Sequence, residues 1–259
     1  MKHSPEIQAR VSRAYSLPLE TLDGTLMTFD LPSAGVEWHA LPEQFLYSID
    51  FVSRHLDSTV YVSKGKTFAA VNGTMAVEHD AGEACPFDLV LTPKEVRAIK
   101  SFGSAPTHAF AGAFPGTRQE FRWASGGRLS LPFASASSSK AEQIAALLDG
   151  FEWNNLHEVD TIWRGQVAGH FSFKPVRGES GHLWIHPDRI VSGIFDNRPD
   201  TELPIETFAD RKVVFERTVF LSVLKVATAI KFVYGDQTHL LFRGKNIRGV
   251  AIGLREVSS

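Results

Sequence analysis

Apolar residues recur in the first half of the chain at the spacing of an α-helix and then at the spacing of β-strands. Apolar positions separated by four, three and four residues predict a helix with one buried face. Short β-branched runs follow, and the pairs Lys64-Gly65 and Asn72-Gly73 between them are typical of hairpin turns. We therefore expect a helix followed by antiparallel strands. The helical apolar positions are Phe45, Ile49, Val52 and Leu56.

Residues 87–133 predict a strand, a short helix and a three-stranded meander. They read FDLVL, TPKEVRAIKSF, THAFAGAF, RQEFRWAS and GRLSLPF. Residues 212–255 repeat this order as KVVFE, RTVFLSVLKVATAI, KFVYG, THLLFRG and IRGVAIGLR. The expected helix-opening residues, Thr92 and Thr218, lie about half of the 259-residue chain apart. An internal repeat on this scale indicates two copies of one supersecondary unit.

Composition divides the chain into four segments. Residues 1–24 are polar and interrupted by prolines, which suggests an N-terminal extension, and residues 25–133 form the first expected domain. Residues 134–146, ASASSSKAEQIAA, predict a linker, and residues 147–259 form the second domain, with a helix expected from Trp153. The resulting expectation is an α+β protein of two tandem domains, each with antiparallel sheets and two helices.

Composition and charge are those of an ordinary globular protein. Hydrophobic residues make up 43% and charged residues 22%, and no stretch approaches the length of a membrane span. The N-terminus carries charges where a secretory signal needs an apolar core, so we expect an intracellular, cytoplasmic protein without membrane contact. The lone Cys85 excludes an intrachain disulfide and a cysteine-based metal cluster. The net charge of −2 excludes a uniformly basic surface.

Ten histidines raise the possibility of a metal site. His170, His182 and His186 lie near Asp188, but no third ligand has a recognisable spacing. The chain also lacks a complete phosphate-binding loop, a nucleophile elbow and a serine or cysteine triad. We therefore expect no enzyme activity and no cofactor. A small histidine-centred, metal-dependent enzyme is the least favoured alternative.

Basic residues recur on the predicted helices of both halves. Lys94, Arg97 and Lys100 are spaced every three residues, which places them on one exposed face. A solvated helix face is the ordinary interpretation of one such helix, but recurrence in both halves favours contact with phosphates. No base-reading motif is present, which favours sequence-independent contact with the nucleic-acid backbone. The candidate DNA-contacting residues are Arg54, Lys94, Arg97, Lys100, Arg164, Arg217 and Lys225.

This organisation resembles the DNA sliding clamp family, which includes the bacterial polymerase III beta subunit and proliferating cell nuclear antigen. FDLVLTPKEVRAIKSF and its meander, within residues 36–133, resemble one clamp domain, and residues 147–257 resemble a second. The resemblance implies two helices per domain facing a central hole, with the sheets outside. Two features depart from it: the extension of residues 1–24, and the acidic residues Glu158 and Asp160 in the helix expected from Trp153.

Rings of this family contain six domains, so the resemblance implies a homotrimer of this two-domain chain. It also implies duplex DNA, a DNA polymerase and a clamp loader ATPase as partners. Two-domain clamps occur in eukaryotes, archaea and some bacteriophages, so a phage-encoded protein would act in the host cytoplasm. The partner-peptide groove is expected near Leu131, Ile252 and Leu254. A monomeric clamp-fold module that does not encircle DNA is the main alternative.

Overall fold

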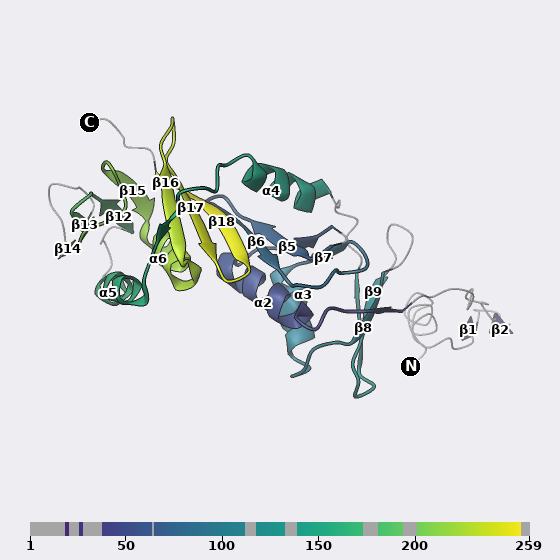
Figure 1. Cartoon of the computed structure of the whole chain (residues 1–259). Helices are drawn as coiled ribbons and strands as arrows, with labels where there is room; N and C mark the ends of the chain where they lie inside the picture. The colour runs from purple at the N-terminus through teal and green to yellow at the C-terminus, as the bar shows by residue number, and fades with distance from the viewer. Residues whose placement is uncertain are drawn as a thin grey trace. The chain divides into compact units, whose positions relative to one another are not determined.

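A computed structural model describes residues 19–20, 26–27, 38–63, 65–111, 118–132, 139–172, 181–193 and 201–254. The chain divides into two compact units, residues 1–38 and 39–259 (Figure 1). In the first unit, β1 (Leu19–Glu20) pairs antiparallel with β2 (Leu26–Met27). The sequences TLMTFDL and GVEWHAL predict strands at 25–31 and 35–41, but most of these residues and of the expected extension lie outside the described residues.

Two series of elements in the second unit follow the same order, a strand, a helix, four strands, a helix and three strands. The predicted strand–helix–meander order is thus present in both halves. The first series comprises β3 (His39–Ala40), α2 (Phe45–Leu56), β4 (Val60–Val62), β5 (Thr67–Val71), β6 (Met75–Asp80), β7 (Leu89–Leu91), α3 (Pro93–Lys100), β8 (His108–Ala111), β9 (Arg118–Arg122) and β10 (Arg128–Pro132). The second comprises β11 (His157–Glu158), α5 (Thr161–Phe171), β12 (His182–Ile185), β13 (Arg189–Ser192), β14 (Thr201–Pro204), β15 (Val213–Glu216), α6 (Arg217–Val226), β16 (Ala229–Val233), β17 (His239–Gly244) and β18 (Ile247–Ile252).

A single antiparallel sheet runs through both halves. Its strand order is β11-β16-β17-β18-β6-β5-β4-β7, and β18 joins β6 with Val250 opposite Ala76. Two four-stranded sheets flank it, with orders β10-β9-β8-β3 and β14-β13-β12-β15. The described residues therefore form an α+β fold with antiparallel sheets, as expected from the sequence, but with five helices instead of the four expected.

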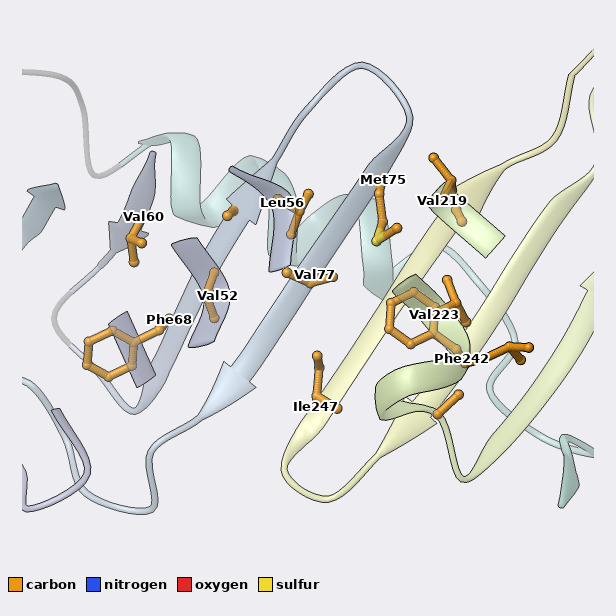
Figure 2. Close-up of a cluster of buried hydrophobic side chains, with 14 of the residues drawn as sticks. Val52, Leu56, Val60, Phe68, Met75, Val77, Val219, Val223, Phe242 and Ile247 are labelled. Atoms are coloured by element: carbon orange, nitrogen blue, oxygen red, sulfur yellow. The ribbon is translucent and has the colours of Figure 1, made fainter. Parts of the chain in front are cut away.

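The central strands of the joined sheet are buried on both faces. On one face, side chains from both halves form one apolar cluster that includes Val77, Val223 and Phe242 (Figure 2). The other face carries a smaller cluster, in which Ile144 and Leu148 lie with residues of β5, β6, β17 and β18. Burial of both faces explains why these strands have more consecutive apolar residues than a half-exposed sheet would allow.

A helix, α4 (Ser139–Asp149), begins inside the predicted linker of residues 134–146 and extends three residues beyond it. Ile144 and Leu148 lie four residues apart on its buried face, and α4 covers the side of the joined sheet opposite α2 and α3 (Figure 1). Small polar residues precede α4 and polar residues form most of its first turn, and its buried apolar residues lie mainly towards the C-terminal end of the helix. This short amphipathic pattern was therefore not evident from the sequence. The division into domains at residues 134–146 remains a prediction.

The helix expected from Trp153 begins later than predicted. His157 and Glu158 pair with β16 as a strand, and the Asp160 side chain accepts a hydrogen bond from the Trp163 N–H at 2.6 Å, which fixes the start of α5. The sequence HFSFKPV at 170–176 predicts a strand, but His170 and Phe171 belong to α5 and residues 173–180 lie outside the described part. Prolines and aspartates in residues 196–210 predict a loop, but this segment contains β14. No helix in the described ranges is long and apolar enough to cross a membrane.

Candidate nucleic-acid interface

A capping box fixes the start of α3 and thereby its exposed face. The Thr92 hydroxyl accepts a hydrogen bond from the Glu95 N–H at 3.3 Å, and the Glu95 carboxylate accepts one from the Thr92 N–H at 2.7 Å. Val96 and Ile99 are buried on the opposite side. The predicted cationic face is therefore exposed. It consists of Lys94, Arg97 and Lys100.

A shared carboxylate connects the exposed faces of α2 and α3. The Lys100 ammonium on α3 lies 2.9 Å from Oδ2 and 3.1 Å from Oδ1 of Asp50 on α2. Arg54, one turn beyond Asp50 on α2, pairs with the same Oδ2. The structure thus brings two predicted DNA-contacting residues together around an acid that sequence analysis did not single out. An acid and a base four residues apart on one helix are neighbours on its surface, so the Asp50–Arg54 pair could have been predicted from the sequence.

The second half presents fewer cations than predicted. Lys225 is exposed in the last turn of α6. Arg164, expected at the end of a helix, lies half-buried in the first turn of α5. Arg217 is wrong as a surface contact because only 4% of it is exposed. It is the first residue of α6 and shares the buried face of Phe220 and Leu224, three and seven residues further on.

Lys225 lies close enough to the end of α2 to affect His55 electrostatically. Burial, with a further contribution from the positive charge of Lys225, lowers the pKa of His55 from 6.5 to about 4. The His55 ring packs 6.3 Å from that of Phe242 on β17. Burial also lowers the pKa of His79 on β6, against a smaller opposing effect of Asp80. These histidines adjoin residues of the second half, a location that spacing along the chain could not reveal.

The three residues predicted for a partner-peptide groove do not form one surface. Leu131 is 7% exposed and lies on β10, in a different sheet from Ile252. The Ile252 N–H donates to the Thr74 carbonyl at 2.9 Å, beside the β5–β6 turn. Leu254 is 36% exposed and lines a cavity of about 360 Å³. Other residues lining this cavity are Arg211, Lys212, Val214 and Gln237.

The histidines considered as metal ligands lie on separate elements and contact other residues. His170 lies at the end of α5, and its Nε2 is 2.9 Å from the Thr201 hydroxyl. His182 lies on β12, opposite Glu216 on β15. In the part of the chain that the structure describes, no group of three His, Cys, Asp or Glu side chains could hold a metal ion.

Neither a protein-family model nor a curated protein sequence matches this chain. Solved structures do match. A DNA polymerase sliding clamp from Pseudomonas aeruginosa superposes with a TM-score of 0.61 at 12% identity, covering 89% of this chain and 71% of that one. The Caulobacter crescentus beta sliding clamp gives 0.57 at 13% identity, covering 89% and 70%. The DNA polymerase III beta chain from Streptococcus pneumoniae gives 0.56 at 12%, covering 86% and 66%. The chain therefore has the fold of bacterial sliding clamps and spans about two thirds of their length.

Proposed function

We propose that this chain, which has the fold of the bacterial sliding clamps, is itself a sliding clamp. Three copies would form a closed ring around duplex DNA and tether a DNA polymerase as its processivity factor. The observation that carries the proposal is the strand pairing between the two halves. It provides a template for the same pairing between neighbouring chains.

β18 is the last strand of the second series, and it pairs with β6, the fourth strand of the first. The strands at the equivalent positions are β10 and β14, and each ends its four-stranded sheet in the described residues. If β10 of one chain paired with β14 of the next, every junction would repeat the β18–β6 junction. Such a head-to-tail interface is heterologous and forms a ring when its rotation closes. It would also protect two open sheet edges from indiscriminate pairing.

The number of subunits follows from the number of domains. The resemblance to the clamp family implies six domains in a ring, and each half of this chain would supply one. Three chains then complete the ring. The proposed complex has a mass near three times the 28.6 kDa of one chain.

DNA contact is assigned to the exposed cations of α2, α3 and α6 and to Arg164 on α5, which is half-buried. These helices contribute to the apolar cluster on one side of the joined sheet, whereas α4 covers the other side. Contacts to phosphates need no base recognition and weaken as salt rises, so a closed ring can slide without dissociating. The proposed role is therefore topological and non-catalytic. The cations assigned to it are Arg54, Lys94, Arg97, Lys100, Arg164 and Lys225.

A closed ring requires partners to open it and to use it. We assign these roles to a separate loader ATPase and to a DNA polymerase inside the cell. The short peptide of such a partner is assigned to the surface beside Ile252 and Leu254, where the cavity next to Leu254 combines apolar and cationic side chains. Leu131, on another sheet, is left out of this surface.

The decisive experiment measures the mass of the full-length chain by light scattering at micromolar concentration. A trimer supports the ring, and a monomer overturns it. A Ser130→Cys, Thr201→Cys variant tests the interface, because these residues lie on β10 and β14. A short bismaleimide should join its subunits into covalent trimers, whereas each single variant, as the matched control, should give at most dimers. Cys85 is buried and its pKa is raised to about 11, mainly by burial, so it should not react.

One observation favours the second candidate, a monomeric clamp-fold module that does not encircle DNA. Arg217 is buried, and Glu158 and Asp160 place negative charge beside the start of α5. The second half is therefore less cationic on its helices than the first. A monomeric mass together with the absence of crosslinked trimers would favour this module over the ring.

A further inference from the structure

The carboxylate of Asp50 lies between two cations on the surface formed by α2 and α3. Its two oxygens contact the ammonium of Lys100 on α3, and Oδ2 also pairs with Arg54 on α2. The side chain of Asp50 is 18% exposed, against 70% for Arg54 and 50% for Lys100. Both cations thus remain open to solvent while the acid lies beneath them.

Folding stability does not account well for this arrangement. Ion pairs whose cations are largely exposed contribute little to stability, because water screens them and ordering a long side chain costs entropy. The apolar faces of α2 and α3 already hold these helices in place through Ile49, Val52, Val96 and Ile99, which are nearly or fully buried. The acid therefore has its main effect on the charge presented to solvent.

We propose that Asp50 is an internal counterion that limits how tightly this surface binds DNA phosphates. The inference rests on the proposed function. With Asp50 ionised, the group of three side chains carries one net positive charge instead of two. A phosphate that approaches Arg54 or Lys100 must compete with a carboxylate already in place. Fewer solution counterions are then released on binding, so the contact is weaker and less dependent on salt.

This restraint suits a protein that must move along DNA rather than remain at one position. Lys94 and Arg97 on the same α3 face are exposed and can attract phosphates. Arg54 and Lys100 would retain long-range attraction but lose part of their short-range affinity to Asp50. Asp50 is thus a positioning residue for the two cations and not itself a DNA contact.

The test compares full-length Asp50→Asn with Asp57→Asn. Both substitutions raise the net charge by one unit, but Asp57 follows α2 as its exposed left-handed C-cap, a conformation that asparagine accepts. Binding to a fluorescent duplex is measured by anisotropy across a NaCl series. Asp50→Asn should tighten binding about three- to tenfold at 50 mM NaCl relative to Asp57→Asn and steepen the slope of log K against log salt by about 1. Asp50→Glu should restore wild-type behaviour.

A second probe separates this inference from the proposed function. Elution from a heparin column requires no ring and no DNA. If no variant binds duplex but Asp50→Asn elutes at higher salt than Asp57→Asn, the counterion inference stands, and the clamp proposal is decided separately by the mass of the chain in solution. If Asp50→Asn matches or falls below Asp57→Asn on both probes, with circular dichroism unchanged, the inference is wrong.

Discussion

Arg248 Nε lies 2.7 Å from Glu78 Oε2, and the two residues face each other across the β18–β6 pair that joins the halves of the chain. The Glu78 side chain is 8% exposed and that of Arg248 is 30% exposed. Arg248 also reaches Asp149 of α4 at 2.7 Å and lies over the Trp153 ring. One guanidinium thus connects both halves of the sheet with the helix that covers it.

Arg248→Ala should destabilise the fold by about 2 kcal/mol or more, because it leaves the buried Glu78 carboxylate without its partner. Urea unfolding at a fixed protein concentration measures the change. Asp149→Asn is the matched control, since its side chain is 66% exposed, and it should cost no more than about 0.5 kcal/mol. If the two substitutions lower the free energy of unfolding equally, the contact between Arg248 and Glu78 does not stabilise the fold more than the contact between Arg248 and Asp149.

Gly249→Ala should destabilise the junction between the halves by about 1–3 kcal/mol. A Cβ at this position would lie 2.3 Å from Phe242 Cζ and 2.8 Å from the Ala76 carbonyl oxygen across the sheet. Gly165→Ala in α5 provides the contrast, because a Cβ there meets nothing within 4 Å. It should stabilise the helix by about 0.5–1 kcal/mol. Thermal unfolding of both variants should therefore shift in opposite directions.

His55 should make stability depend on pH. Its pKa lies near 4 in the folded protein, below the ordinary 6.5, so the unfolded chain takes up the proton more readily. The corresponding stability is present above pH 6.5 and is lost as pH falls towards 4, by roughly 3 kcal/mol in total. Urea midpoints between pH 7.5 and 4.5 should fall less steeply for His55→Phe than for the wild type.

The exposed His157 provides the control for that measurement. His157→Gln should retain the wild-type pH dependence. Some dependence should also remain in His55→Phe, because burial lowers the pKa of His79 as well. Parallel curves for His55→Phe and the wild type would contradict the assignment to His55.

Thr92→Ala should destabilise α3 by about 1 kcal/mol, because it removes one half of the capping box. Thr218→Ala should cost less. Sequence spacing predicted that Thr218 opens α6, but Glu216 is the N-cap and its side chain makes no capping hydrogen bond. Circular dichroism melts of the two variants measure the difference, and a larger effect at Thr218 would contradict it.

Lys94→Ala and Arg97→Ala should each lower the slope of log K against log salt for duplex binding by about 1. Arg189→Ala is the control, because Arg189 lies on β13 and pairs with Glu202 on the neighbouring strand β14. Its loss should leave DNA binding unchanged. If all three variants bind alike, the cationic face of α3 does not contact DNA.

The sequence by itself determined the type and order of most elements. Apolar spacing located α2 and α3, and short β-branched runs between turn residues located the strands of both meanders, because local periodicity records which face of an element is buried. The same spacing placed Lys94, Arg97 and Lys100 on one exposed face. The resemblance to the sliding clamp fold rested on this order.

Only the tertiary structure decided which distant segments meet. Strand pairing between β18 and β6, the cover that α4 provides and the burial of Arg217 all depend on surfaces far apart in the chain. A basic residue at a helix end has the same local pattern whether solvent or another element lies beside it. The Lys100 contact with Asp50, and hence the net charge of the α2–α3 surface, became visible only once the two helices were packed together.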